Sequence, residues 1–303
     1  MLEGTRRMAD KHKVEDFYNQ VAADYHKIYE PKKMSYKNGI ADYLRLQILL
    51  RLLATAEVKS LYEVGVGDGT VLTLIHKMGL QVAGCDIAPN MVETARKRFH
   101  EIGVTSPDII LADIENGISI SRQLAGGKYD AMMALGVMPH VKKDHLALDN
   151  MRMMVKTGGK LYIEFRNSLF SLFTFNRHTH DFVTQRLLKD VAAPVVHRVS
   201  EELKKSCHMD KPPIRDTVRG KDGPGYDLIL AKFHNPLELP ELLGASGFGN
   251  VKFHWYHFHA AQPWLAEELG DVYDEESLKL EHYTGDWRGM FLCSAVLVEA
   301  DAQ

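Results

Sequence analysis

The chain has 303 residues, of which 45% are hydrophobic and 25% are charged, and its formal net charge is -3. These values are typical of one elaborated globular domain, or of one domain with an insertion. The slightly acidic balance excludes the broad basic surface that non-specific nucleic-acid binding needs. Three scattered cysteines without a CxxC pair exclude a disulfide framework and a cysteine-based zinc site.

Two helical patterns, over 10–30 and 37–56, begin the chain. The first residues lack the apolar core of a secretory signal. The most apolar stretch, 44–56, is too short to cross a bilayer, and it is interrupted by Arg45 and Arg51. We therefore expect a cytoplasmic protein with no membrane partner.

Strand-like runs and helical patterns alternate from residue 60 onward. Gly79 is expected to close the first of these helices, and Asn90 to cap the second. Apolar strands that alternate with helices predict a parallel sheet with helices on both faces. The expected strands are 60–66, 81–87, 108–114, 129–137 and 159–166, and the expected helices are 70–79, 90–103 and 143–155.

Residues 167–232 interrupt this alternation and show no clear period. They follow the fifth expected strand, so we interpret them as an insertion. The regular pattern then resumes, because 235–249 is typical of a helix. Two further strands, 250–260 and 291–300, flank an acidic helical segment over 267–280.

The glycine-rich turn after the first strand is the most informative motif. It contains Gly65, Gly67 and Gly69, with Glu63 two residues before the first glycine. Such a turn lets a ligand approach the backbone closely. A nicotinamide dinucleotide fold would instead need G-x-G-x-x-G. A carboxylate at Glu63 would repel a pyrophosphate and attract a cationic group such as a sulfonium.

The motif Glu63-Val-Gly-Val-Gly-Asp-Gly resembles the first motif of class I S-adenosylmethionine-dependent methyltransferases. Further motifs in the family's order are similar: the acid Asp86 after the second strand, "LADIEN", "YDAMMALGVMPHV", "MVKTGGKLYIEF" and a tyrosine-rich helix near the N-terminus. The resemblance covers 14–166 and 233–299 and implies S-adenosylmethionine as cofactor. It assigns cofactor binding to Tyr18, Tyr25, Glu63, Gly65, Gly67, Gly69, Asp86, Ile87, Met91, Asp113, Ile114 and Leu135.

The resemblance also implies a domain organisation. The expected fold is an α/β, Rossmann-like, doubly wound sheet of seven strands. Residues 1–56 would form an N-terminal helical lid, and 57–166 with 233–303 the cofactor-binding core. Residues 167–232 would be an inserted substrate cap after the fifth strand.

Methyl transfer needs an aligned acceptor and, for many acceptors, a base. His140 and Glu164 follow or end strands of the expected sheet, so we predict both as general bases. A structural histidine and an internal ion pair are the alternatives. In and near the insertion, Arg166, Arg177 and His178 are predicted to bind an anionic substrate, although the insertion's phenylalanines alone could form a small core. No metal site is expected.

The leading hypothesis is therefore a small-molecule methyltransferase, with O- or N-methylation favoured. The motif of nucleobase amino methylation, [DN]-P-P-[YF], and the Pro-Cys of cytosine C5 methylation are both missing. An RNA or protein methyltransferase and a noncatalytic cofactor-binding scaffold remain as alternatives. The acceptor, the methylated atom and a homo-oligomeric state stay open.

Overall fold

The computed structural model describes residues 11–29, 36, 39–121, 123, 126–216, 224–229 and 232–303. The two N-terminal helical patterns form helices, although the second half of the first tightens into a 3₁₀ helix. Both expected helices start at residues that lie outside the described part of the chain. The elements are α1 (Lys11–Val21), the 3₁₀ helix η1 (Ala22–Tyr29) and α2 (Ala41–Thr55).

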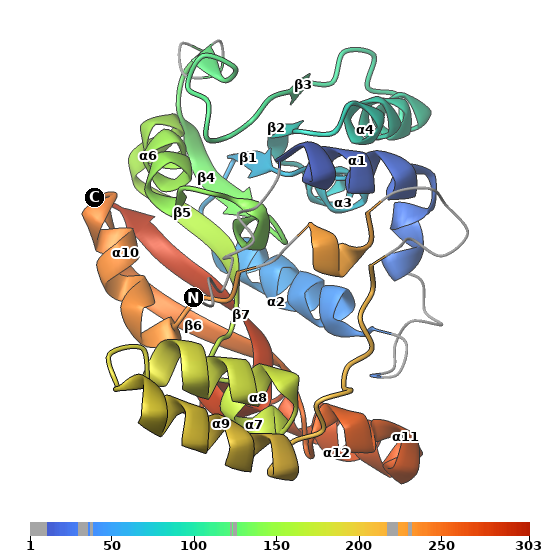
Figure 1. The fold of residues 1–303 in the computed structure, drawn as a ribbon. Coiled ribbons are helices and arrows are strands. Elements are labelled where there is room, and N and C mark those ends of the chain that lie inside the picture. The colour runs from blue at the N-terminus through green and yellow to red at the C-terminus, as the bar shows by residue number, and fades with distance from the viewer. Residues whose placement is uncertain are drawn as a thin grey trace.

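A seven-stranded sheet in the order β3-β2-β1-β4-β5-β7-β6 forms the centre of the molecule (Figure 1). Neighbouring strands from β3 to β5 run parallel, whereas β7 is antiparallel to both β5 and β6. The expected Rossmann-like fold is confirmed. The strands are β1 (Ser60–Val64), β2 (Gln81–Asp86), β3 (Ile109–Leu111), β4 (Tyr129–Ala134), β5 (Val155–Arg166), β6 (Phe248–Phe258) and β7 (Cys293–Ala302).

Helices cover both faces of the sheet because the strands are apolar on both sides. On β4, Met132 packs into one core cluster with α6 and α10, and Met133 packs into the other with α2, α3 and α4. Successive strand residues point to opposite faces, which explains this alternation. The covering helices after α2 are α3 (Thr70–Lys77), α4 (Pro89–Glu101), α6 (Asp144–Met154) and α10 (Leu239–Ala245).

The predicted cap of α4 is wrong. Helix α4 begins at Pro89, and the residue before it, Ala88, is the N-cap. Proline at the first helical position fixes a helical φ and loses no hydrogen bond. Asn90 lies inside the first turn instead, where its side chain donates to the backbone oxygen of Asn19 in α1 at 3.2 Å.

The segment without a clear period is largely helical. Two segments, 167–232 and the one between β6 and β7, pack together, since Trp264 donates to the backbone oxygen of Thr174 at 2.9 Å. Both lie beside the lower end of the sheet in Figure 1. Their elements are α7 (Ser171–Thr174), α8 (Arg177–Phe182), the π-helix η5 (Val183–Leu187), α9 (Ala193–Ser206), η6 (Tyr226–Leu228), η8 (Pro263–Leu265), α11 (Ala266–Leu269), α12 (Asp271–Leu280) and α13 (Gly289–Leu292). The short helix η7 (Pro236–Glu238) lies between the two segments, directly before α10.

A buried ion pair joins helix α2 to strand β5. Arg45 pairs with Glu164, and both residues are less than 10% exposed. Tyr256 of β6 donates its hydroxyl to Glu164 at 2.7 Å, and the backbone N–H of Gly136 donates to the same carboxylate at 2.7 Å. Burial alone would raise the pKa of Glu164, but the charge and hydrogen bond of Arg45, the Tyr256 hydrogen bond and the Arg166 charge together outweigh it, so this pKa lies below its usual value.

We predict that Arg45→Met destabilises the fold by about 3–5 kcal/mol near neutral pH, because it leaves a buried carboxylate unpaired. The pKa of Glu164 is lower in the folded state than in the unfolded chain. The pair therefore stabilises the fold above the unfolded pKa of about 4.3, and this contribution disappears as the pH falls through the folded pKa. Chemical denaturation at several pH values measures both effects.

Arg198→Met is the matched control, since Arg198 pairs with Glu202 on the exposed face of α9. It should cost less than about 1 kcal/mol. An equally small cost for Arg45→Met would mean that Glu164 does not depend on Arg45.

Candidate active site

A pocket lies at the carboxyl ends of β1, β2, β3 and β4, where the order of the strands reverses on either side of β1. Its empty volume, including the open mouth, is about 700 Å³. Ligands of open α/β sheets bind at this kind of crevice. The lining residues are Lys11, Val14, Tyr18, Tyr25, Val64, Gly65, Gly67, Cys85, Asp86, Ile87, Ala112, Asp113, Ile114, Glu115, Leu135, Gly136, Val137, His140 and Val141.

Many of these residues were expected from the sequence and others were not. Glu63, Gly69, Met91 and Glu164 lie outside the lining, as do Arg166, Arg177 and His178. Val64, Cys85 and Ala112 are strand-end residues beside predicted acids, so their position could have been inferred. Nothing in the sequence pattern indicates Lys11 or Glu115.

The glycine turn after β1 has the backbone that its composition predicts. Gly65, Gly67 and Gly69 have φ values of 73°, 54° and 79°, in the region that favours glycine. Their backbone amides are already hydrogen-bonded within the protein. The N–H of Gly65, for example, donates to the backbone oxygen of Cys85 at 2.7 Å. What the pocket gains from the turn is therefore an open backbone surface rather than free N–H donors.

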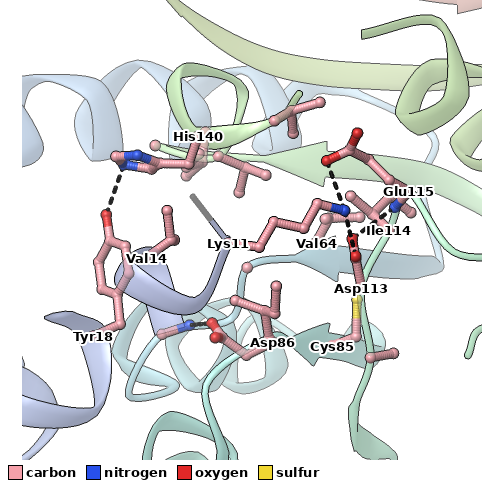
Figure 2. A pocket seen from close by; sticks show the side chains of 18 of the residues that line it. Lys11, Val14, Tyr18, Val64, Cys85, Asp86, Asp113, Ile114, Glu115 and His140 are labelled. Carbon is pink, nitrogen blue, oxygen red and sulfur yellow. Dashed lines mark hydrogen bonds and ion pairs between the residues drawn. The ribbon is translucent and has the colours of Figure 1, made fainter. Parts of the chain in front are cut away.

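Asp86 fixes this turn to strand β2. Its carboxylate accepts from the N–H of Gly67 at 2.9 Å, the dashed line at Asp86 in Figure 2, and from the N–H of Ala88 at 2.9 Å. Burial raises the pKa of Asp86 to about 6, although these backbone donors act in the opposite direction. The carboxylate keeps lone pairs that can accept hydroxyl groups of a ligand in the pocket.

A second acidic group lies at the end of β3. Lys11 of α1 extends across the pocket and pairs with Asp113 and, at 2.9 Å, with Glu115, as Figure 2 shows. Burial acts against the charge on Lys11, but the two acids outweigh it and raise the pKa of this lysine. The helix thus places a cation on the acids that line this end of the pocket.

The opposite end of the pocket carries His140 and Tyr18. His140 ends the 3₁₀ helix η4 (Met138–His140) after β4, and it is 8% exposed. The Tyr18 hydroxyl lies 3.0 Å from His140 Nε2 (Figure 2). Burial raises the pKa of Tyr18 well above its usual value, so its phenol is neutral. A neutral phenol can donate to or accept from Nε2, and the tautomer of the imidazole decides which.

The expected cofactor residues outside the lining support the pocket from behind. Glu63 is 2% exposed, and its Oε2 has no hydrogen-bond partner among the described residues. Burial raises the pKa of Glu63 well above its usual value, although Arg45 acts to lower it. Gly69 is the N-cap of α3. Met91 packs in a small apolar cluster with Ala22 of η1 and with residues of α1.

Glu164 has a structural task that its position on the strand did not reveal. Its carboxylate is occupied by Arg45, Tyr256 and the N–H of Gly136, and it does not line the pocket. A general base must reach the proton that it abstracts. The structure therefore does not support Glu164 as a base, and its contact with Gly136 makes it a support for the pocket wall.

Two of the three predicted substrate residues, Arg166 and His178, contact aromatic rings outside the pocket. The guanidinium of Arg166 lies 4.8 Å from the ring centre of Tyr226 and 5.8 Å from that of Phe233. The ring of His178 lies 5.8 Å from that of Phe233. Arg177 instead pairs with Asp227 at 3.7 Å.

The donor and acceptor groups of the pocket fit S-adenosylmethionine. Asp86 can accept ribose hydroxyls, Asp113 can accept an adenine amino group, and Ile87 and Ile114 supply apolar walls. The carboxylates favour a sulfonium cation and disfavour a pyrophosphate. Within the described part of the chain, no group of histidine, cysteine or acidic residues could hold a metal ion, and no helix there is long and apolar enough to span a membrane.

Comparisons with known proteins agree with this geometry. The family model of a methyltransferase domain matches residues 62–163. A ubiquinone biosynthesis O-methyltransferase of Xanthomonas axonopodis pv. citri (strain 306) is 26% identical over 146 residues, which are 48% of this chain and 59% of that protein. The homologue of Shewanella halifaxensis is 26% identical over 46% of this chain and 53% of its own length. The chain thus spans little more than half the length of these relatives.

Solved structures share the fold across the whole chain. Magnesium protoporphyrin IX methyltransferase from Synechocystis PCC 6803, with bound S-adenosylhomocysteine, has a TM-score of 0.52 at 15% identity and covers 97% of this chain and 99% of its own. Phosphoethanolamine N-methyltransferase 2 of Haemonchus contortus has a TM-score of 0.50 at 14% identity, covering 100% of this chain and 61% of its own. Residues 62–163 thus match a methyltransferase domain, and the chain has the Rossmann-like fold of the class I S-adenosylmethionine-dependent methyltransferases.

Proposed function

We propose that the protein transfers a methyl group from S-adenosylmethionine to an oxygen or nitrogen atom of a small-molecule acceptor. The observation that carries this proposal is that His140 lines the same pocket as Gly65, Gly67 and Asp86. A candidate proton acceptor and the residues that fit the cofactor thus share one enclosed space. The names of the curated relatives, which are O-methyltransferases, favour an oxygen acceptor.

The cofactor would supply an activated methyl group, so the protein has to bind, orient and deprotonate. Asp86 and Asp113 would hold the nucleoside, and the glycine turn would leave room for the part of the cofactor next to it. Lid residues Tyr18 and Tyr25 would cover it, since both line the pocket. The enclosed position brings acceptor and donor together, which is a large part of catalysis in a bimolecular displacement.

His140 is the proposed base for the acceptor proton. Its ring lies at the pocket wall, and Tyr18 holds the Nε2 edge. With Nε2–H donating to the Tyr18 hydroxyl, the neutral imidazole would use Nδ1 as its proton acceptor. Glu164 is proposed as a positioning residue, because it binds the N–H of Gly136 beside the same wall.

The small-molecule assignment is supported by the size of the site. The pocket has an empty volume of about 700 Å³ including its open mouth, and Lys11, Val14 and Tyr18 of α1 form part of its lining. The remaining expectations, residues 1–56 as a lid, 167–232 as a substrate cap and a cytoplasmic location, are part of the proposal.

Asp86→Asn is expected to weaken the binding of S-adenosylhomocysteine by about 10- to 100-fold, since it removes a charge-assisted acceptor for the ribose. Because the pKa of Asp86 is about 6, wild-type affinity should decrease as the pH falls below that value. Protonation removes the charge that the hydroxyls prefer, so this pH dependence should be absent in the variant. Calorimetric titration measures both.

The control is Asp108→Asn, because Asp108 is exposed and does not line the pocket. Its affinity should equal that of the wild type. If Asp86→Asn also binds normally at every pH, Asp86 does not hold the ribose.

Lys11→Met is expected to strengthen the binding of S-adenosylhomocysteine by up to about five-fold. Lys11 pairs with the acids that the nucleoside would use, and a partly exposed ion pair is worth up to about 1 kcal/mol. S-adenosylhomocysteine has no sulfonium charge, so the gain would not reflect relief of charge repulsion. Lys97→Met, on the exposed side of α4, is the control. Weaker binding of Lys11→Met would show that Lys11 holds the cofactor rather than competing with it.

His140→Ala is expected to lower kcat at least about 100-fold and to retain cofactor binding. The acceptor comes from a screen for label transfer from methyl-labelled S-adenosylmethionine to a metabolite extract. The acid limb of the pH–rate profile should disappear in the variant. A screen that finds no labelled product would contradict the proposed function.

Glu164→Gln separates the two candidate bases. If Glu164 is a positioning residue, the substitution should lower Tm. The kcat of the folded variant should change less than ten-fold. A loss of kcat as large as that of His140→Ala, at unchanged Tm, would restore Glu164 as a base.

A further inference from the structure

We propose that Arg166, Tyr226 and Phe233 form the acceptor subsite of this enzyme, and that the acceptor is a flat aromatic molecule that carries a carboxylate. The inference rests on the proposed function, since it names the acceptor of the same site. It goes further by assigning a charge and a shape to that acceptor. Three observations support it: the charge balance around Arg166, the path from Arg166 to His140, and the rings along this path.

The acids near Arg166 pair with other arginines, so Arg166 has no carboxylate partner among the described residues. Asp227 pairs with Arg215 at 3.1 Å and with Arg177 at 3.7 Å. The remaining acids whose charge acts on Arg166, Asp42 and Glu164, are both paired with Arg45.

No acid in the described ranges forms an ion pair with Arg166, although this residue is half-buried at the end of β5. A half-buried guanidinium stacked on aromatic rings retains donors in a fixed fork, which matches the geometry of a carboxylate.

Contacts through a single ring, that of Tyr226, connect Arg166 to the pocket. Tyr226 lies under the Arg166 guanidinium, and its ring centre is 5.8 Å from that of His140. His140 lines the cofactor pocket. The Tyr226 ring already carries the guanidinium groups of Arg166 and Arg215, each 4.8 Å from its centre, so an acceptor would have to lie beside this ring. It would then place its carboxylate at Arg166 and its nucleophilic hydroxyl at His140.

The rings along this path favour a flat acceptor. Phe17 of α1 contacts the edge or face of Tyr226 at a centroid distance of 5.7 Å, and Tyr18 contacts His140 at 5.6 Å. Aromatic surfaces of this kind bind planar groups by offset or edge-to-face packing. The rings come from the proposed lid, from the loop after β4 and from the insertion, so an acceptor there would be enclosed by three separate segments.

The transfer itself balances without a further reactant. The acceptor oxygen forms a bond to the methyl carbon, and the carbon–sulfur bond of the cofactor breaks with its electron pair on sulfur. The hydroxyl proton passes to His140. The carboxylate does not react and only orients the ring.

The test is calorimetric titration of the protein saturated with S-adenosylhomocysteine, at constant ionic strength. The probes are benzoate, 4-hydroxybenzoate and 3,4-dihydroxybenzoate, each compared with the neutral amide of the same ring. In the wild type we expect at least one carboxylate to bind about ten-fold or more tightly than its amide. Arg166→Met should abolish this difference, and Arg166→Lys should retain part of it.

Arg198→Met removes the same charge from the exposed face of α9 and should keep the wild-type preference. Unchanged S-adenosylhomocysteine affinity shows that each variant is folded. The inference is overturned if no carboxylate binds the wild type more tightly than its amide, or if Arg166→Met keeps the preference. The wild-type comparison is decisive even if Arg166→Met does not fold.

Label transfer to the same probes separates this inference from the proposed function. Transfer to neutral acceptors without a preference for carboxylates would support the methyltransferase and overturn the subsite. A preference for carboxylates that depends on Arg166, without transfer to any acceptor in the metabolite screen, would support the anion site and contradict the proposed activity.

Discussion

The rest of the site depends on the absence of side chains in the turn after β1. A Cβ on Gly65 would lie 2.4 Å from the Val137 side chain, and one on Gly67 would lie 3.2 Å from the ring of Tyr25. A Cβ on Gly69 would meet Ala95 of α4 at 3.0 Å. Each glycine thus faces a different segment: the loop after β4, the N-terminal helices and α4. Only a backbone without side chains lets these segments converge on one crevice.

The two ends of this crevice carry opposite charge and therefore suit different ligands. One end holds Asp86, Asp113 and Glu115, and Lys11 of α1 offsets part of that negative charge. Beyond His140, at the other end, the excess is positive, because Arg166 has no acidic partner among the described residues. A donor with a cationic sulfur and an acceptor with an anionic group would therefore enter from opposite sides and meet at the histidine.

Local motifs were readable from the sequence, whereas partnerships across the chain were not. The glycine turn and Asp86 follow from the spacing of neighbouring residues, and the apolar runs predicted the seven strands. Asn90 failed as a cap because Pro89 started the helix one residue earlier. Glu164 reads as a free acid at a strand end, and only the fold brings Arg45, 119 residues away, to its carboxylate. The sequence gives no periodic signal for a pairing at that separation.

Tyr226 connects the insertion to the edge of the site, although no described residue of 167–232 lines the pocket. Helices α7 to α9 pack beside the end of the sheet, and the chain then returns toward α1 through η6 (Figure 1). This return places Tyr226 against Phe17, His140 and Arg166. The segment lies outside the 62–163 match to the methyltransferase family. Most of the pocket lining lies within that match, whereas Tyr226, which contacts His140, lies outside it.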